Sequence, residues 1–347
     1  MSIRKLEPLL DSMPVAWLLS GEPFVRYRVL VDLLSKSEDD KEGIAIKKRI
    51  RTCKPIKRIF KKQNKDGYWG APRDIYTWWP KKDTTFWLLG VLADFGLEKS
   101  DKDIERACEY VFSTQHPTGG WGCAPPPKPY ECFTGILAES LAKLGYGSDR
   151  RLKKAYEWLI HRQRRDGGFW CKDTGQPHRP REREPSCAYA TLCVLGALAQ
   201  NPELQNSAVA KKSTGFLLKC WDNRGKIKYT GHDSQIGTGW EKLKYPFTDY
   251  RILYYLDTLT RLEFAKKDRR IGAMIDLLFS KQDKNGRFYA ESIHKVWSSF
   301  DFGQKKSPSK WITLLAYRTI KRLDVSESSH YVRRKQARHR GDFESKL

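Results

Sequence analysis

Four cysteines in the middle of the chain form the pattern with the clearest chemical meaning. Cys123 and Cys171 each end a short glycine–aromatic phrase, and each is followed by another cysteine, Cys132 or Cys187, that opens an apolar stretch. Neighbouring thiolates bind zinc in tetrahedral sites and, as a second choice, an iron–sulfur cluster. The pattern predicts a bound metal, with the packing of four small buried residues as the alternative. If all four side chains are ligands, the site is closed and structural.

Three carboxylates open predicted helices and are candidate catalytic groups: Asp83, Glu131 and Asp249. Capping of a helix N-terminus is the alternative role of each. The side chains predicted to bind a ligand beside them are Tyr250, Lys310 and Trp311. Aromatic rings with a few acids suit a carbocation, a stacked base or a flat apolar ligand, so these residue types do not identify the substrate.

A long loop over residues 174–185 is stiffened by proline and carries Arg179 and Arg181. These two arginines are predicted to line the mouth of a site for an anion. In the alternative reading the loop is solvated, and Glu182 and Glu184 neutralise the arginines.

A phrase that recurs along the chain must position these residues: Gln, several polar residues, Gly and then an aromatic residue. Copies begin at Gln63, Gln115, Gln163 and Gln282, with a degenerate copy at Cys220. Their starts lie roughly 50 to 60 residues apart, which is typical of arrays whose units cannot bury their apolar faces alone. The glycine permits a sharp turn at a helix end, the aromatic residue folds back as an apolar plug, and Gln can bond to backbone groups at a neighbouring helix end.

Pairs of helices are predicted around these phrases. In each pair the first helix is apolar nearly all round, and the second has a charged face; the apolar helices begin near Thr84, Glu131, Ser186, Phe247 and Ser309. A helix without a polar face is buried on all sides. The sequence therefore predicts an all-α fold, namely an α/α toroid of inner and outer helices. About eleven to thirteen helices are expected, and a linear solenoid is the alternative arrangement. In a toroid the four cysteines lie at one rim, within reach of one another.

Residues 1–324 are predicted to form one domain, with helices over 5–36 packed on it. Residues 325–347 are predicted to form a disordered basic tail.

Charge and composition limit the possible partners. Lys and Arg number 65 against 41 Asp and Glu, a net charge of +24. This excess favours nucleic acid, acidic membrane surfaces or diphosphates, unless it only reflects the source proteome. No apolar run approaches a membrane span and no signal-peptide core is visible, so a cytoplasmic protein is expected.

The phrase and three further segments resemble the prenyltransferase and squalene-cyclase repeat superfamily, in particular its short prokaryotic members. The segments are Ala16-Trp-Leu-Leu with residues 25–34, Gly120-Trp-Gly-Cys with Glu131-Cys-Phe-Thr-Gly, and Ser309-Lys-Trp-Ile-Thr-Leu. The resemblance extends from about Trp17 to Leu323 and implies an α/α fold. It does not by itself imply an activity, because a fold does not carry its function with it.

The class II cyclases of this superfamily protonate their substrate with an Asp-x-Asp-Asp motif, which is missing here. The nearest run is Lys82-Asp83-Thr84-Thr85, which keeps one aspartate and places a lysine before it. Asp83 is therefore expected to cap the following helix rather than to protonate a substrate. The Asp-x-Cys of the zinc-containing protein prenyltransferases has no clear copy either.

Two functions remain open. The first is an enzyme acting on an isoprenoid-like or other apolar or aromatic ligand in an aromatic central cavity, with basic residues at the rim holding a diphosphate. The second is a basic toroid that binds nucleic acid, such as a DNA repair or base-processing enzyme. The charge, the arginine-rich loop and the tail favour the second, although no known nucleic-acid motif is found. The shared architecture is the more specific signal, and it favours the first.

Overall fold

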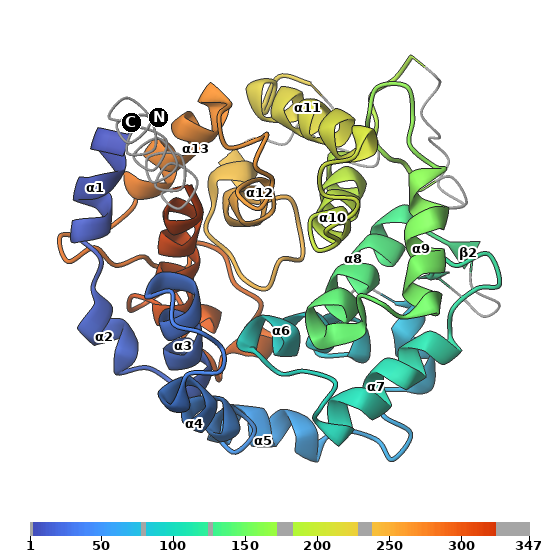
Figure 1. Cartoon of the computed structure of the whole chain (residues 1–347), viewed down its shortest axis with the longest axis horizontal. Helices are drawn as coiled ribbons and strands as arrows, with labels where there is room; N and C mark the ends of the chain where they lie inside the picture. Colours follow the sequence, from blue (N-terminus) through green and yellow to red (C-terminus); the bar gives the residue numbers. More distant parts are fainter. Residues whose placement is uncertain (1–2, 78–80, 124–127, 172–182, 228–237, 324–347) are drawn as a thin grey trace, which may run out of the picture.

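The computed structural model describes residues 3–77, 81–123, 128–171, 183–227 and 238–323. The predicted ligand residues Arg179 and Arg181 and the basic tail over 325–347 lie outside the described residues. Helices form two concentric layers around a centre (Figure 1). The inner helices are α3 (Pro23–Arg28), α6 (Thr85–Phe95), α8 (Glu131–Leu141), α10 (Ala188–Leu198), α12 (Ile252–Leu259) and a helix over residues 310–323.

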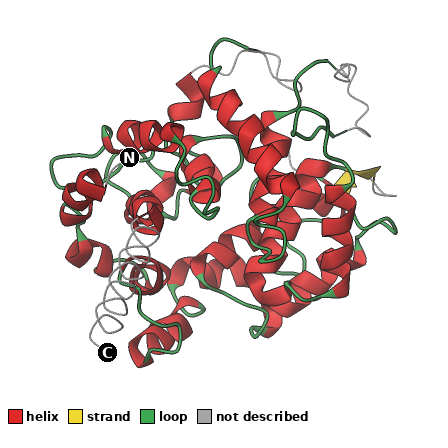
Figure 2. Cartoon of the chain, turned by 45° about the horizontal axis from the view of Figure 1, so that its top comes forward, coloured by secondary structure: helices red, strands yellow, loops and turns green. Residues whose placement is uncertain are grey.

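The outer layer surrounds these helices (Figures 1 and 2). It consists of α1 (Ile3–Asp11), α2 (Val15–Leu19), α4 (Lys41–Ile50), α5 (Lys54–Lys61), α7 (Lys102–Ser113), α9 (Arg150–Ile160), α11 (Ala208–Asp222) and α13 (Arg269–Phe279). Two π-helical turns cover Val29–Leu33 and Ala142–Tyr146, and four 3-10 turns cover Pro72–Tyr76, Thr238–Glu241, Lys295–Trp297 and Asp301–Gly303. Strands β1 (Gly122–Cys123) and β2 (Lys128–Pro129) form a short antiparallel hairpin.

The predicted alternation of apolar and amphipathic helices explains the two layers. In α10 every residue except Tyr189 is buried. In α9 the buried residues are Leu152, Ala155, Tyr156 and Leu159, whose spacing places them on one face. Inner helices are therefore surrounded by protein, and outer helices expose a charged side.

The recurring phrase joins each outer helix to the next repeat. The Gln63 amide donates to the carbonyl oxygens of Gly67 and Asp103, each at 2.9 Å, and Gln115 and Gln163 repeat this pattern on later repeats. Gly67 has φ +98°, and a Cβ atom there would lie 2.5 Å from the Arg106 carbonyl oxygen, so only glycine fits this turn.

The aromatic residue of each phrase is anchored on an inner helix by a threonine. The backbone N–H of Trp121 donates to Thr134 Oγ1 at 2.9 Å, and its indole N–H donates to the Val111 carbonyl oxygen at 2.9 Å. Equivalent backbone-to-threonine bonds join Trp69 to Thr85, Phe169 to Thr191 and Phe288 to Thr313. The role of these threonines is not among the predictions made from the sequence.

The two ends of the described array meet, so the array is a closed ring rather than a linear solenoid. Ser12 Oγ, which follows α1, lies 3.0 Å from the Tyr317 hydroxyl of the last inner helix. The Phe24 and Trp311 rings pack edge to face with centroids 5.7 Å apart. These contacts confirm the predicted α/α toroid.

One predicted helix start and one predicted helix cap differ from the structure. The helix expected from Phe247 begins only at Ile252, because residues 243–251 form a loop that includes Pro246, which has no N–H to donate to a helix. The N-cap of α6 is Thr84 rather than Asp83. In the described part of the chain the helices also outnumber the expected eleven to thirteen, because the N-terminal region divides into the short helices α1 to α5.

A buried ion network joins the C-terminal ends of three inner elements. Asp257 of α12 accepts from Arg318 Nη2 at 2.6 Å, from Arg322 Nη1 at 2.9 Å and from Arg261 Nη2 at 3.3 Å. Arg318 also contacts Asp32 at 3.1 Å, which links the last helix to the first repeat. Asp257 and Arg318 are only 2% and 3% exposed, so each charge depends on its partners for stabilisation.

None of the helices formed by the described residues is both long enough and apolar enough to cross a bilayer.

Candidate functional site

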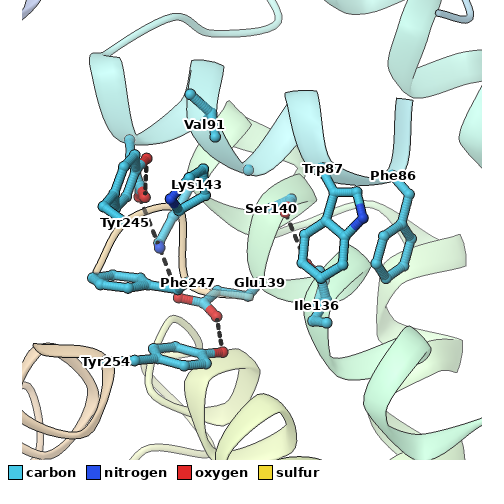
Figure 3. Close-up of a pocket in the computed structure, with 13 residues that line it drawn as sticks. Phe86, Trp87, Val91, Ile136, Glu139, Ser140, Lys143, Tyr245, Phe247 and Tyr254 are labelled. Atoms are coloured by element: carbon cyan, nitrogen blue, oxygen red, sulfur yellow. Dashed lines mark hydrogen bonds and ion pairs between the residues drawn. The ribbon is translucent and has the colours of Figure 1, made fainter. Parts of the chain in front are cut away.

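The centre of the ring contains a small cavity of about 50 Å³ (Figure 3). Inner helices α6, α8 and α12 contribute Trp87, Ile136 and Tyr254 to its wall. The loop over 243–251 enters the ring and adds Tyr245 and Phe247, whose ring stacks on Tyr254 with centroids 4.9 Å apart and planes 8° from parallel. The loop occupies much of the space in which the sequence predicted an aromatic cavity.

A lysine holds two carboxylates together in this central cavity. Lys143 Nζ lies 3.0 Å from Asp94 Oδ1 and 2.6 Å from Glu139 Oε1. The Tyr245 and Tyr254 hydroxyls donate to the other oxygens of these carboxylates at 2.9 Å and 3.0 Å. Burial alone would lower the pKa of Lys143, but the charges of Asp94 and Glu139 outweigh burial and raise it above its usual value. The carboxylates thus act as hydrogen-bond acceptors for an ammonium and two phenols.

A much larger hollow of about 810 Å³ opens between α5, the start of α6 and residues 296–300. Its apolar lining includes Ile59, Trp69, Leu88, Trp297 and Phe300. Its charged lining consists of Arg58, Lys61, Lys62, Lys81, Asp74 and Asp83. Lys81 pairs with Asp74 at 3.1 Å, whereas Arg58, Lys61 and Lys62 form no ion pair with any described residue.

A second hollow of about 390 Å³ shares Pro55, Ser299 and Phe300 with the first, so the two hollows adjoin. We call the two hollows together the rim groove. The second hollow adds three cations, Arg26, Arg49 and Lys310. Arg26 Nε is buried and makes no hydrogen bond to the described residues. The rim groove thus combines an apolar wall with an excess of positive charge.

Asp301 fixes the position of Lys310 in the groove. Its carboxylate accepts from Ser309 Oγ at 2.9 Å, from the Lys310 N–H at 2.6 Å and from the Trp311 N–H at 3.3 Å. The carboxylate therefore caps the helix over 310–323. The Lys310 ammonium lies 5.1 Å from the centre of the Trp17 ring, within the range of a cation–π contact.

The predicted catalytic carboxylates lie in three different places. Asp83 lines the rim groove. Glu131 is fully buried, and Arg162 Nε contacts its carboxylate at 2.6 Å. Asp249 contacts Lys244 Nζ at 3.0 Å and Arg251 Nε at 2.8 Å in the loop before α12. Neither the central cavity nor the rim groove, both lined by described residues, contains all three.

The predicted ligand-binding residues that the structure describes are also separated. Lys310 lines the groove. Tyr250 packs against Trp240 with ring centroids 5.1 Å apart, next to Asp249. Trp311 is fully buried among aromatic residues, with Phe95 at 4.8 Å and Tyr245 at 5.5 Å between centroids, so it forms core rather than a ligand surface.

Two of the four predicted metal ligands are in contact. Cys132 Sγ and Cys171 Sγ lie 3.3 Å apart, and Cys123 and Cys187 are near enough for the Cys171 charge to act on both. Burial raises the pKa of Cys123 and of Cys187 to about 12. Within the described ranges, no group of three or more His, Cys, Asp or Glu side chains is arranged to hold a metal ion. The four-cysteine metal site therefore stays a prediction.

Most residues that line the groove could not be predicted from the sequence. Arg58 and Lys61 of α5, with Lys62 directly after it, belong to a strongly amphipathic segment whose polar face does not indicate a site. Trp297 and Phe300 come from a segment more than 230 residues later in the chain. Spacing within a repeat cannot reveal this pairing, because it arises where the ring closes.

Comparison with known proteins agrees with the fold. A model of the squalene-hopene cyclase C-terminal domain family matches residues 74–264. A squalene–hopene cyclase of Bradyrhizobium diazoefficiens is 27% identical over 182 residues, and a probable one of Sinorhizobium fredii is 25% identical over 182 residues. These matches cover 51% of this chain but only 25% and 26% of the relatives, so the chain spans about a quarter of their length.

Similar solved structures belong to different classes of enzyme. The type II terpene cyclase MstE from Scytonema has 14% identity and a TM-score of 0.31, over 79% of this chain and 96% of that chain. A glycosyl hydrolase family 88 protein from Bacteroides vulgatus has 10% identity and a TM-score of 0.47, over 93% and 99%. Such distant likenesses carry no argument about activity. The family match over residues 74–264 covers more than half of the 347 residues, and the chain belongs to the squalene-hopene cyclase C-terminal domain family.

Proposed function

We propose that the protein is an enzyme that acts on an isoprenoid-like amphiphile, a prenyl chain bearing a diphosphate, bound in the rim groove. The observation that carries this proposal is the pairing, in one hollow of about 810 Å³, of an apolar wall with cations that no described carboxylate neutralises. Ligand sites usually measure about 300–1,000 Å³, so the groove is large enough for such a ligand and the central cavity of about 50 Å³ is not.

The two halves of the ligand would meet different parts of the groove. The prenyl chain would cover Val296, which is 45% exposed and has an apolar side chain, together with Trp297 and Phe300. The diphosphate would lie at Lys61 and Lys62, since oxyanions are favoured by several nearby cations. Asp83 lines the same hollow, and in this proposal it is the carboxylate that would accept a proton from the bound ligand. The missing Asp-x-Asp-Asp motif speaks against cyclisation begun by protonation.

Binding of farnesyl diphosphate, farnesol and inorganic pyrophosphate, measured by calorimetry, tests the proposal. Farnesyl diphosphate should bind more tightly than either part alone. Replacing both Lys61 and Lys62 with alanine should weaken the binding of farnesyl diphosphate about two- to thirtyfold, because each exposed ion pair contributes about 0.2–1 kcal/mol. The same variant should leave the binding of farnesol unchanged. Lys57→Ala is the matched control, since Lys57 is an exposed lysine of the same helix that does not line the groove.

A second variant tests the apolar half of the groove. Val296→Asp should weaken farnesol and farnesyl diphosphate alike, because it places a carboxylate against the prenyl chain. No measurable binding of farnesyl diphosphate would refute the proposal. Sub-micromolar DNA binding that falls steeply with salt and survives removal of residues 325–347 would favour the nucleic-acid alternative, since such a slope reports phosphate counterion release.

The proposal for a metal is separate from the groove. A zinc ion on Cys123, Cys132, Cys171 and Cys187 is supported by the 3.3 Å contact between two of these thiols. Sulfur ligands about 2.3 Å from a tetrahedral zinc lie about 3.8 Å apart, so small movements would accommodate the ion. Elemental analysis should find about one equivalent of zinc. Cys132→Ser should lose this zinc and should be much less stable than the unaltered protein. Less than about half an equivalent of zinc or iron would leave packing as the role of these cysteines.

A further inference from the structure

The second hollow of the rim groove, of about 390 Å³, differs in its lining from the first hollow. Polar and charged side chains outnumber apolar ones in its wall, and three of them are the cations Arg26 of α3, Arg49 of α4 and Lys310 of the last inner helix. Its volume lies within the usual range of ligand sites, about 300–1,000 Å³. The second hollow is therefore large enough to bind a small polar molecule of its own.

Two of these cations have no carboxylate partner in the part of the chain that the structure describes. Arg26 is half-buried, and its Nε atom is fully buried without a hydrogen bond to any described residue. Arg49 is exposed, and neither arginine forms an ion pair with a described residue. A buried donor without an acceptor loses its hydration without compensation. An acceptor atom of a ligand in the hollow would restore the missing hydrogen bond of Arg26.

Two carboxylates, Glu22 and Asp301, line the same hollow. The oxygens of Asp301 already accept hydrogen bonds at the start of the helix over 310–323. The stem of Lys310 lies against Gly21, because a Cβ atom on this glycine would be 3.0 Å from Lys310 Cδ. With both carboxylates ionised, the three cations leave one unmatched positive charge among the described residues that line the second hollow.

We propose that the second hollow binds a small organic molecule through a single carboxylate group. One negative charge balances the unmatched positive charge, whereas a dianion would add repulsion from Glu22. The planar guanidinium of Arg26 can donate two parallel hydrogen bonds to a carboxylate, and charge-assisted hydrogen bonds are the stronger class. Arg49 and Lys310 add further attraction for the anion. The remainder of the molecule would contact Phe300, an apolar residue of the same wall.

A molecule in the second hollow would lie beside the prenyl chain proposed for the first. Pro55, Ser299 and Phe300 line both hollows, so the two ligands would meet there. The bound carboxylic acid is thus placed as a second substrate, and this part of the inference rests on the proposed function. The carboxylate site itself depends only on the second hollow, so it can be tested without a prenyl ligand.

The probes are para-fluorobenzoate, its uncharged analogue para-fluorobenzamide and the dianion para-fluorophenyl phosphate, which are similar in shape and differ in charge. Titration followed by fluorine NMR at pH 7 and constant ionic strength measures the affinity of each. The benzoate should bind at least about tenfold more tightly than the benzamide, because it accepts charge-assisted hydrogen bonds. The phosphate should bind no more tightly than the benzoate, because its second charge has no unmatched cation.

Variants of the two arginines locate the binding. Arg26→Gln should weaken para-fluorobenzoate at least about tenfold and leave para-fluorobenzamide unchanged. Arg49→Gln removes an exposed cation, so it should weaken the benzoate about two- to fivefold without affecting the fold. Lys48→Gln is the matched control, since Lys48 is exposed on the same helix and lines neither hollow. The double alanine variant at Lys61 and Lys62, which line only the first hollow, should also bind the benzoate normally.

Equal affinity for the benzoate and the benzamide would overturn the proposal, as would tighter binding of the phosphate. Unchanged benzoate affinity in both Arg26→Gln and Arg49→Gln would overturn it too. An equal loss in Lys48→Gln would do the same, because the binding would then follow the general charge of the surface. A protein that binds the benzoate in this arginine-dependent way, but not farnesyl diphosphate, would support the carboxylate site while refuting the proposed function.

Discussion

Replacing Asp257 with asparagine should lower the free energy of unfolding by about 3–5 kcal/mol, measured by urea denaturation at pH 7. This carboxylate is 2% exposed and contacts Arg318, Arg322 and Arg261. Removing one partner of a buried ion pair is costly because it leaves the other charge buried without compensation. The loss should be large because Arg318 is itself only 3% exposed and has Asp32 as its remaining carboxylate partner among the described residues.

The pH dependence of the free energy of unfolding provides a second test of Asp257→Asn. Burial would raise the pKa of Asp257, but Arg318 and the other cations outweigh it and hold that pKa well below its usual value. A lowered folded-state pKa gives stability that is present above the unfolded-state pKa of about 3.9 and lost as the pH falls through the folded value. The difference in the free energy of unfolding between the unaltered protein and Asp257→Asn should therefore become smaller below about pH 4. Asp276→Asn, on an exposed face of α13, is the control and should change stability by less than about 0.5 kcal/mol. An equal effect of the two substitutions would contradict a role for the buried network.

Replacing Trp121 with alanine should lower the free energy of unfolding by about 3–5 kcal/mol, the usual cost of truncating a large buried aromatic residue. The side chain is 2% exposed, and its indole N–H donates to the Val111 carbonyl oxygen of the preceding outer helix at 2.9 Å. Its backbone N–H donates to Thr134 of an inner helix, so the residue joins both layers of the ring. Denaturation with urea, followed by tryptophan fluorescence and circular dichroism, measures the loss.

Tyr289→Ala is the matched control for this substitution. Tyr289 follows the last copy of the phrase, but it is 36% exposed. Its removal should cost clearly less than the removal of Trp121, because 36% of the Tyr289 surface remains in contact with water. If the two substitutions cost the same, the aromatic residue of the phrase is not the connection between layers that the hydrogen bonds of Trp121 indicate.

The sequence was sufficient to predict the ring because its determinants are local and repeated. Gln63, Gly67 and Trp69 lie within seven residues, and their spacing recurs in later repeats with the same helix ends and turns. The alternation of apolar and charged helices then specifies two layers. The resemblance to the squalene-cyclase superfamily, confirmed by the family match, rests on these same features.

The position of the sites could not be predicted in the same way. The helix expected to begin at Phe247 begins at Ile252, and the residues before it belong to the loop over 243–251. This loop fills the centre of the ring and places Lys244 and Asp249 near Lys82. The groove depends on α5 meeting residues 296–300, which only ring closure brings together. Both arrangements depend on contacts between distant segments that no repeat spacing encodes.

The most direct measurement is photoaffinity labelling with a farnesyl diphosphate analogue that carries a photoreactive group on its prenyl chain. Label should be found by mass spectrometry in peptides that contain residues 55–62 and 296–300, the two sides of the larger hollow, and excess farnesyl diphosphate should suppress it. Suppressible label on Phe247 or Tyr254 would instead place the prenyl chain in the central cavity and contradict the rim groove as the ligand site. Labelling that farnesyl diphosphate does not suppress would show that the groove has no specific affinity for this class of ligand.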